Sequence, residues 1–127
     1  YVPSSSCFFV QATLRVSGTS RSDTDIWLNG MWQKHEDFLG FPSWQKVGNT
    51  EAMLARLSDG RWHAATTTDI QAGSHSSFFY QTDGTPYDHP KEVPSWEVWN
   101  GAAWEVQEAV RVEEAFWEVH GDCSIAG

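Results

Sequence analysis

The sequence predicts an all-β fold, a small antiparallel sandwich or barrel of about seven to nine short strands whose termini are joined by a disulfide. Two patterns indicate strands: apolar and polar residues alternate in short runs, and turn residues recur about every ten positions. No segment shows the apolar period of an amphipathic helix. With 8 Trp, 7 Phe and 3 Tyr among 127 residues, a thin sheet can build its core from few large side chains. We expect one domain over residues 1–127.

The clearest strand runs from Phe8 to Val16. Every second residue of this run is apolar, whereas the alternate face carries Gln11, Thr13 and Arg15. This period of two is typical of a strand with one buried face. The stretch from residue 17 to residue 25 has no apolar residue and contains Gly18, which indicates a loop.

Three dipeptides predict tight turns between antiparallel strands: Asn29-Gly30, Asp59-Gly60 and Asn100-Gly101. Asn-Gly and Asp-Gly suit such turns because both residues tolerate a positive φ. We expect the segment from Gln33 to Ser43 to be irregular, since it contains a glycine and a proline.

The remaining strands follow from short apolar or aromatic runs between turn residues. They are expected at 44–47, 52–57, 61–66, 78–82, 96–99 and 103–106, with one or two final strands at 110–112 and 115–120. The segment Pro86–Pro94 contains three prolines and reads as extended chain outside a central strand.

The formal net charge of −9 is unevenly distributed. Residues 1–50 carry four acids and four bases, residues 51–90 five and two, and residues 91–127 eight and two. An acidic surface repels nucleic acid and anionic lipid, because binding to them depends on Lys and Arg. No run approaches the ~20 apolar residues of a membrane span. We therefore expect no nucleic-acid partner and no membrane span, although peripheral docking on a membrane complex remains open.

Two cysteines, Cys7 and Cys123, lie near opposite ends of the chain. Because domain termini are often close together, we expect a disulfide between them and an oxidising compartment; two separate buried thiols are the alternative. The chain begins at Tyr1 without a basic and apolar leader, so we expect a processed or excised piece.

The sequence offers little support for a metal site or a cofactor. Three segments place a histidine beside a carboxylate, but none has the paired spacing of a zinc site. They are His35-Glu36-Asp37, Asp88-His89 and His120-Gly121-Asp122. We expect no metal and no cofactor.

Catalysis is also weakly supported. Glu97 and Glu105 lie across the Asn100-Gly101 turn and could face each other as an acid–base pair, but two exposed glutamates are the simpler interpretation. The runs Ser74-His75-Ser76 and Thr66-Thr67-Thr68-Asp69 contain nucleophile and base types without a nucleophile elbow. We expect the chain not to be an enzyme.

The tryptophans are the strongest functional signal. Trp96 shares its strand face with Val98, so Trp99 points to the other face. Exposed Trp side chains anchor protein interfaces and stack on sugar rings. We therefore predict a binding surface formed by Trp96, Trp99 and Trp104 together with the proline-rich segment Pro86–Pro94, which ends at Pro94.

The order of these motifs resembles a family of small aromatic-rich β modules, of uncertain function, in dinoflagellate and related protist proteins. The resemblance covers about residues 26–112 and rests on the segments 28–32, 44–47, 59–62, 93–104 and 110–112, with Leu54. The chain departs from the family pattern at Trp32, where Tyr is usual, and at 41–44, where Phe-Pro-Ser-Trp replaces a Gly-Arg-Pro-x-Tyr segment. The resemblance implies a photosynthetic-protist origin and carries over no catalytic residue.

Three functions remain open from the sequence. The first is a non-catalytic protein-interaction or assembly module, such as an accessory subunit docked on a larger photosynthetic complex. The second is a carbohydrate-binding module or lectin, and the third is a small-molecule carrier or barrel enzyme. A protein partner ranks ahead of a sugar. The thylakoid lumen, which the resemblance alone suggests, or a secreted location would fit the expected disulfide.

Overall fold

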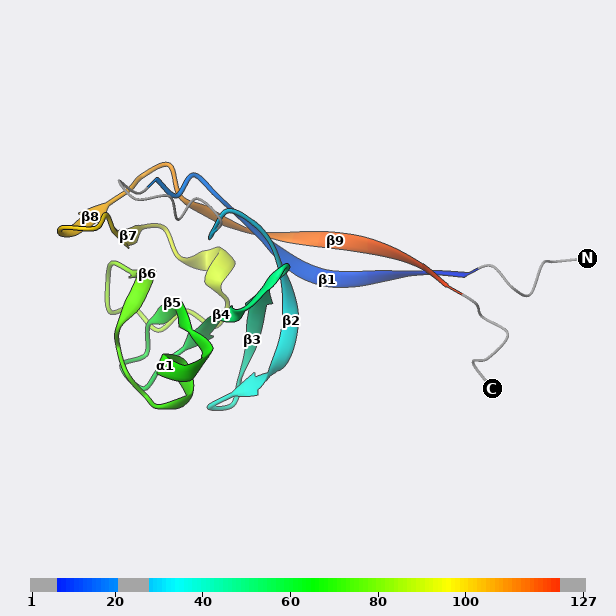
Figure 1. Ribbon diagram of the computed structural model, residues 1–127, viewed down its shortest axis with the longest axis horizontal. Helices are drawn as coiled ribbons and strands as arrows, with labels where there is room; N and C mark the ends of the chain where they lie inside the picture. The colour runs from blue at the N-terminus through cyan, green and yellow to red at the C-terminus, as the bar shows by residue number, and fades with distance from the viewer. Residues whose placement is uncertain (1–6, 21–27, 122–127) are drawn as a thin grey trace, which may run out of the picture.

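The computed structural model describes residues 7–20 and 28–121 and shows one curled, half-barrel sheet (Figure 1). Nine antiparallel strands in these residues form the order β8-β7-β6-β5-β4-β3-β2-β1-β9. The strands are β1 (Cys7–Ser17), β2 (Gly30–Phe38), β3 (Phe41–Lys46), β4 (Asn49–Arg56), β5 (Trp62–Thr66), β6 (Ser77–Gln81), β7 (Trp96–Trp99), β8 (Trp104–Val106) and β9 (Arg111–Gly121). The all-β prediction is confirmed, and one curled half-barrel sheet takes the place of the predicted sandwich or barrel.

One face of the sheet carries the main hydrophobic core. The alternation predicted for the first strand is confirmed where side chains are described, since Leu14 and Val16 are buried and Arg15 is exposed. Large aromatic side chains from five strands fill this face: Trp32, Trp44, Trp62, Phe79 and Trp96, with Val112 of β9 at its edge. Each such ring buries a large area, which is how a thin sheet obtains a core.

The proline-rich segment between β6 and β7 covers part of this core. It forms one 3-10 turn, η2 (Pro90–Glu92), and Pro90 is buried. The indole Nε1 of Trp62 donates to the carbonyl of Tyr87 at 2.8 Å. The ring of His89 meets Trp44 at 5.3 Å between centroids. The segment lies outside the strands, as predicted, but it is not extended throughout, since it contains a 3-10 turn and much of it packs on the core.

The turn predictions have different outcomes. Asp59-Gly60 joins β4 to β5, and the Leu57 amide donates to the Arg61 carbonyl at 3.0 Å. Asn100-Gly101 begins a four-residue connection from β7 to β8. The backbone N–H of Asn100 donates to the Ala103 carbonyl at 3.0 Å and closes this connection. Gly101 has a φ of 98°, the conformation for which glycine is preferred.

The predicted hairpin at Asn29-Gly30 is wrong. Gly30 begins β2 and pairs with Val16 of β1, while Leu28 lies in a 3-10 turn. The Asn29 side chain instead accepts from the amide of Thr19 at 3.0 Å and donates to its carbonyl at 3.1 Å. Asn29 therefore closes the connection from β1 to β2, because its amide group satisfies backbone groups there.

The irregular segment expected from Gln33 to Ser43 is also wrong. β2 and β3 form a hairpin through Leu39-Gly40, with Phe38 opposite Phe41. Leu39 has a φ of 52° and Gly40 a φ of 84°. A leucine rarely adopts positive φ, so its position in the turn gave no local signal.

β1 and β9 form a long two-stranded ribbon that projects from the curled body (Figure 1). Cys7–Ser17 pairs along its whole length with Arg111–Gly121, but only Thr13–Val16 also pairs with β2. Cys7 lies opposite Gly121. Cys123 lies outside the described residues, so the disulfide remains a prediction.

The opposite face of β4 and β5 is covered by a short helix that the sequence did not predict, α1 (Thr67–Gln71). The Thr66 side chain accepts from the Asp69 amide and caps the helix. Ile70 is buried and packs with Met53 and Ala65 in a second hydrophobic cluster. Among the described residues, no helix is long and apolar enough to cross a membrane.

Candidate functional site

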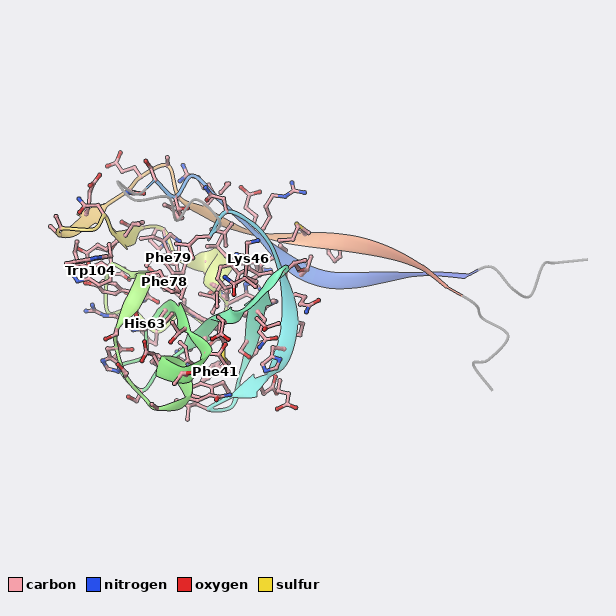
Figure 2. All side chains as sticks on the ribbon, viewed as in Figure 1. Phe41, Lys46, His63, Phe78, Phe79 and Trp104 are labelled. Atoms are coloured by element: carbon pink, nitrogen blue, oxygen red, sulfur yellow. The ribbon has the colours of Figure 1, made fainter. Side chains whose placement is uncertain are left out.

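The face of the sheet opposite the main core, which α1 partly covers, also carries a row of aromatic rings. We call this row the aromatic strip. It consists of one residue from each of strands β5 to β8: His63, Tyr80, Trp99 and Trp104. Strand register places them, because His63 lies opposite Tyr80 and Trp99 opposite Trp104. The ring centroids of His63 and Tyr80 are 5.4 Å apart at 12°, and those of Tyr80 and Trp104 are 4.8 Å apart at 89°. Figure 2 shows Trp104 at the end of the body farthest from the ribbon.

His63 is buried, and its ring is held by stacking and by hydrogen bonds at both nitrogens. It is 3% exposed, and the ring of His75, from the connection between α1 and β6, also stacks on it at 5.4 Å and 26°. Its Nε2 lies 2.8 Å from the Asp59 carboxylate, and its Nδ1 lies 2.7 Å from the Ser77 hydroxyl. These partners assign the neutral tautomer in which Nε2–H donates to Asp59 and Nδ1 accepts from Ser77.

Burial and hydrogen bonding set the charge states of this pair. Burial lowers the pKa of His63 and outweighs the opposing effect of the Asp59 carboxylate. Partial burial raises the pKa of Asp59, but hydrogen bonds from the Arg61 amide and the His63 ring hold it below its usual range. At neutral pH the pair is therefore a carboxylate beside a neutral imidazole.

Tyr80 is held from the other side by Glu97. The two residues are opposite each other on β6 and β7. The hydrogen bond between the Tyr80 hydroxyl and Glu97 raises the pKa of Tyr80, and burial adds to the shift. The phenol therefore stays protonated and donates to a carboxylate, which fixes the ring that supports Trp104.

Two hollows flank Trp104, a residue that is 38% exposed. The first, of about 230 Å³, is lined by Asp59, His63, His75, Tyr80 and Trp104. The second, of about 370 Å³, is lined by Asp69, Ser76, Ser77, Phe78, Trp99 and Trp104. Each hollow combines aromatic walls with a carboxylate, the composition of a site that holds a polar or cationic group.

The structure separates the four residues predicted to form the binding surface. Trp99 is half-buried and Trp104 exposed, and their rings lie 5.5 Å apart. Trp96 is 1% exposed and packs in the core with Val98, so it offers no surface to a partner. Pro94 is exposed but lines another hollow, of about 430 Å³, between η2 and β9.

The expectation that Glu97 and Glu105 could face each other is wrong. In the register of β7 and β8, Glu97 lies opposite Val106 and Glu105 opposite Val98. Because side chains alternate along each strand, the two glutamates belong to opposite faces. Glu97 binds Tyr80, while Glu105 accepts from the Asn100 side chain at 2.9 Å.

Sequence reasoning missed Asp59, His63, Ser77 and Tyr80 as a group. The sequence predicts only a turn at Asp59 and a strand at His63. The spacing of Asp59 and His63 was the one local signal. A histidine on a strand, four residues after an aspartate in the preceding turn, can contact that aspartate. Of the proposed nucleophile runs, only His75, Ser76 and Asp69 line the hollows.

Among the described residues, no group of three His, Cys, Asp or Glu side chains is placed to hold a metal ion. Comparison with protein-family models, curated proteins and solved structures finds no match to this chain.

Proposed function

We propose that the chain is a non-catalytic interaction domain that docks a protein partner through Trp104 and its two hollows. The exposure of Trp104 carries this proposal. Tyr80 and Trp99 hold the indole from two sides, so binding would immobilise few additional rotamers. Large aromatic side chains held in this way are typical interface anchors.

The charges around Trp104 favour a basic or neutral partner. Asp59 and Asp69 each line one hollow, and Glu97 lies opposite Val106 beside them. An acidic rim attracts a basic surface and repels an anionic one. An accessory-subunit role on a larger complex, in the thylakoid lumen or in a secreted setting, extends this proposal and depends on the resemblance to protist modules and on the predicted disulfide.

The test is purification of the native complex with tagged wild-type chain and with Trp104→Ala. We expect Trp104→Ala to stay folded and to lose the partner protein that the wild type retains, with an unfolding free energy lower by about 0.5–1.5 kcal/mol for each of its two aromatic pairs. Phe116→Ala is the matched control, because Phe116 is 68% exposed and lies on β9. Retention of the partner by Trp104→Ala would place the interface elsewhere.

A serine hydrolase is the second candidate, favoured by the hydrogen-bonded chain Asp59–His63–Ser77. In such an enzyme the Ser77 Oγ attacks an ester carbonyl while its proton passes to His63 Nδ1, and Asp59 stabilises the imidazolium. The imidazolium then returns this proton to the leaving oxygen as the ester C–O bond breaks, which releases the alcohol and leaves acyl-Ser77. Water then hydrolyses the acyl-Ser77 intermediate. The proposal ranks second because His63 is 3% exposed and is held among other rings.

A fluorophosphonate reagent tests this second candidate, since it transfers its phosphonyl group to an activated serine and releases fluoride. A hydrolase would show labelling at Ser77 that disappears in Ser77→Ala and persists in Ser76→Ala. Absence of labelling in the wild type would exclude an activated Ser77.

A further inference from the structure

We propose that the hollow between Asp59 and Trp104 binds the guanidinium group of an arginine presented by the protein partner. This inference rests on the proposed interaction function and names the chemical group that the surface recognises. It follows from the acceptor capacity of Asp59, the ring geometry at Trp104 and the surrounding charges.

The Asp59 carboxylate has acceptor capacity left. Its Oδ1 accepts from the Arg61 amide at 2.9 Å, and its Oδ2 accepts from His63 at 2.8 Å. Each carboxylate oxygen can accept about two hydrogen bonds, so each retains one acceptor site. The side chain is 28% exposed and lines the hollow. Two N–H groups can therefore bind it without displacing its present partners.

The aromatic walls favour a flat cation. Tyr80 and Trp104 meet at 89°, so their rings form two perpendicular sides of the hollow. A guanidinium stacks on an indole face while its N–H groups point outward in its own plane. A lysine ammonium would satisfy the charge but would offer neither the planar stack nor the paired donors.

Fixed charges around the hollow select against anions. Asp59 lines it, and Glu97 contacts the hydroxyl of Tyr80. The positive charge of Arg61 lies close enough to lower the pKa values of His63 and Tyr80. The two carboxylates nevertheless outnumber this one cation. Residues 51–127 together hold thirteen acids and four bases, so the wider field also attracts a cation.

The probes are three capped tripeptides with arginine, citrulline or lysine between glycines. Citrulline keeps the shape of arginine and removes the charge. Binding is followed on the Trp104 indole N–H resonance of the isotope-labelled full chain, assigned with Trp104→Phe. We expect the arginine peptide to shift this resonance and to bind at least about tenfold tighter than the citrulline peptide, with weaker binding at high salt.

Asp59→Asn tests the carboxylate. Asparagine can still accept from the Arg61 amide, so the turn is retained, while the charge is lost. We expect this variant to lose the preference for arginine over citrulline. Asp37→Asn is the matched control, because Asp37 is 70% exposed and lies on β2, and it should bind like the wild type.

Equal binding of arginine and citrulline peptides, or an unmoved Trp104 resonance, overturns the inference. A shift caused by a neutral oligosaccharide and not by the arginine peptide also overturns it, and would indicate a sugar site. If Trp104→Ala loses the native partner but no arginine preference exists, the proposed function stands and this inference fails. If arginine binds but Trp104→Ala keeps its partner, the proposed function fails instead.

Discussion

Tyr80 and Trp104 are in contact although the strand β7 lies between their own strands, β6 and β8. The indole reaches back across β7 and meets the phenol edge to face at 4.8 Å. This contact fixes the orientation of an exposed ring at the end of the sheet. The hydrogen bond from Tyr80 to Glu97 and the stack on His63 fix the phenol in turn.

Replacement of Tyr80 should therefore loosen Trp104 more than it destabilises the fold. We expect Tyr80→Leu to broaden or shift the Trp104 indole resonance and to reduce partner binding. The unfolding free energy should fall by about 0.5–1.5 kcal/mol for each aromatic pair lost. Tyr87→Leu is the control, since Tyr87 packs against the core instead of Trp104. An unchanged Trp104 resonance in Tyr80→Leu would contradict the supporting role.

Acidification should destabilise the domain in two steps. Because burial lowers the pKa of His63 below 6.5, the unfolded chain takes up a proton before the folded one does. Stability therefore falls as pH drops below about 6.5 and levels off beneath the folded pKa. His89, whose pKa burial also lowers, acts in the same direction. The stabilising effect of Asp59, whose pKa is depressed from 3.8, is lost at still lower pH.

Denaturant unfolding at about pH 7.5 and about pH 5 measures the first step. We expect the wild type to lose stability between these values and His63→Gln to lose less, with the remainder due to other histidines. His35→Gln, a substitution on β2 outside the aromatic strip, should leave the loss unchanged. An equal pH dependence in wild type and His63→Gln would show that His63 titrates normally.

Gly18 should tolerate no side chain. It has a φ of 81°, and a Cβ there would lie 2.0 Å from the carbonyl oxygen of Ala109. Gly48 has a φ of 87° with open space around it, so Gly48→Ala should cost only the backbone strain, about 1–2 kcal/mol. We expect Gly18→Ala to lower the unfolding free energy clearly more than Gly48→Ala. Equal losses would show that the β1 connection can move away from Ala109.

A disulfide between Cys7 and Cys123 should be detectable as a linked peptide pair in a non-reducing digest. Closing a loop of ~100 residues stabilises by up to about 4.7 kcal/mol in the chain-entropy model. We therefore expect reduction, or Cys7→Ser, to lower the unfolding midpoint. Two thiols that react with an alkylating reagent in the native protein would contradict this prediction, and the argument for an oxidising compartment would fail with it.

Local sequence patterns predicted most of the strands, although they missed β2 over residues 33–38. A period of two identified the first strand and correctly separated Trp96 and Val98 from Trp99, because successive side chains on a strand point to opposite faces. Asp59-Gly60 and Asn100-Gly101 identified two connections because these dipeptides favour turn conformations. Both inferences depend only on residues that are adjacent in the chain.

Predictions from short sequence segments were wrong where contacts with distant parts of the chain determined the backbone conformation. Asn29 binds Thr19 across the connection from β1 to β2, so Asn29-Gly30 forms no hairpin of its own. Leu39 adopts positive φ between two strands that pair on either side of it. In both places the energy of long-range pairing exceeds the local preference.

The candidate site itself was decided only by the tertiary structure. Ser77 meets His63 because β5 pairs with β6 in a register that shifts between Ala64 and Ala65, while Asp59 reaches His63 from the turn before β5. A one-residue change in that register would turn Tyr80 to the core face and leave Trp104 without its support. Register depends on how the whole sheet pairs and on its bulges, and no short segment of this sequence encodes it alone.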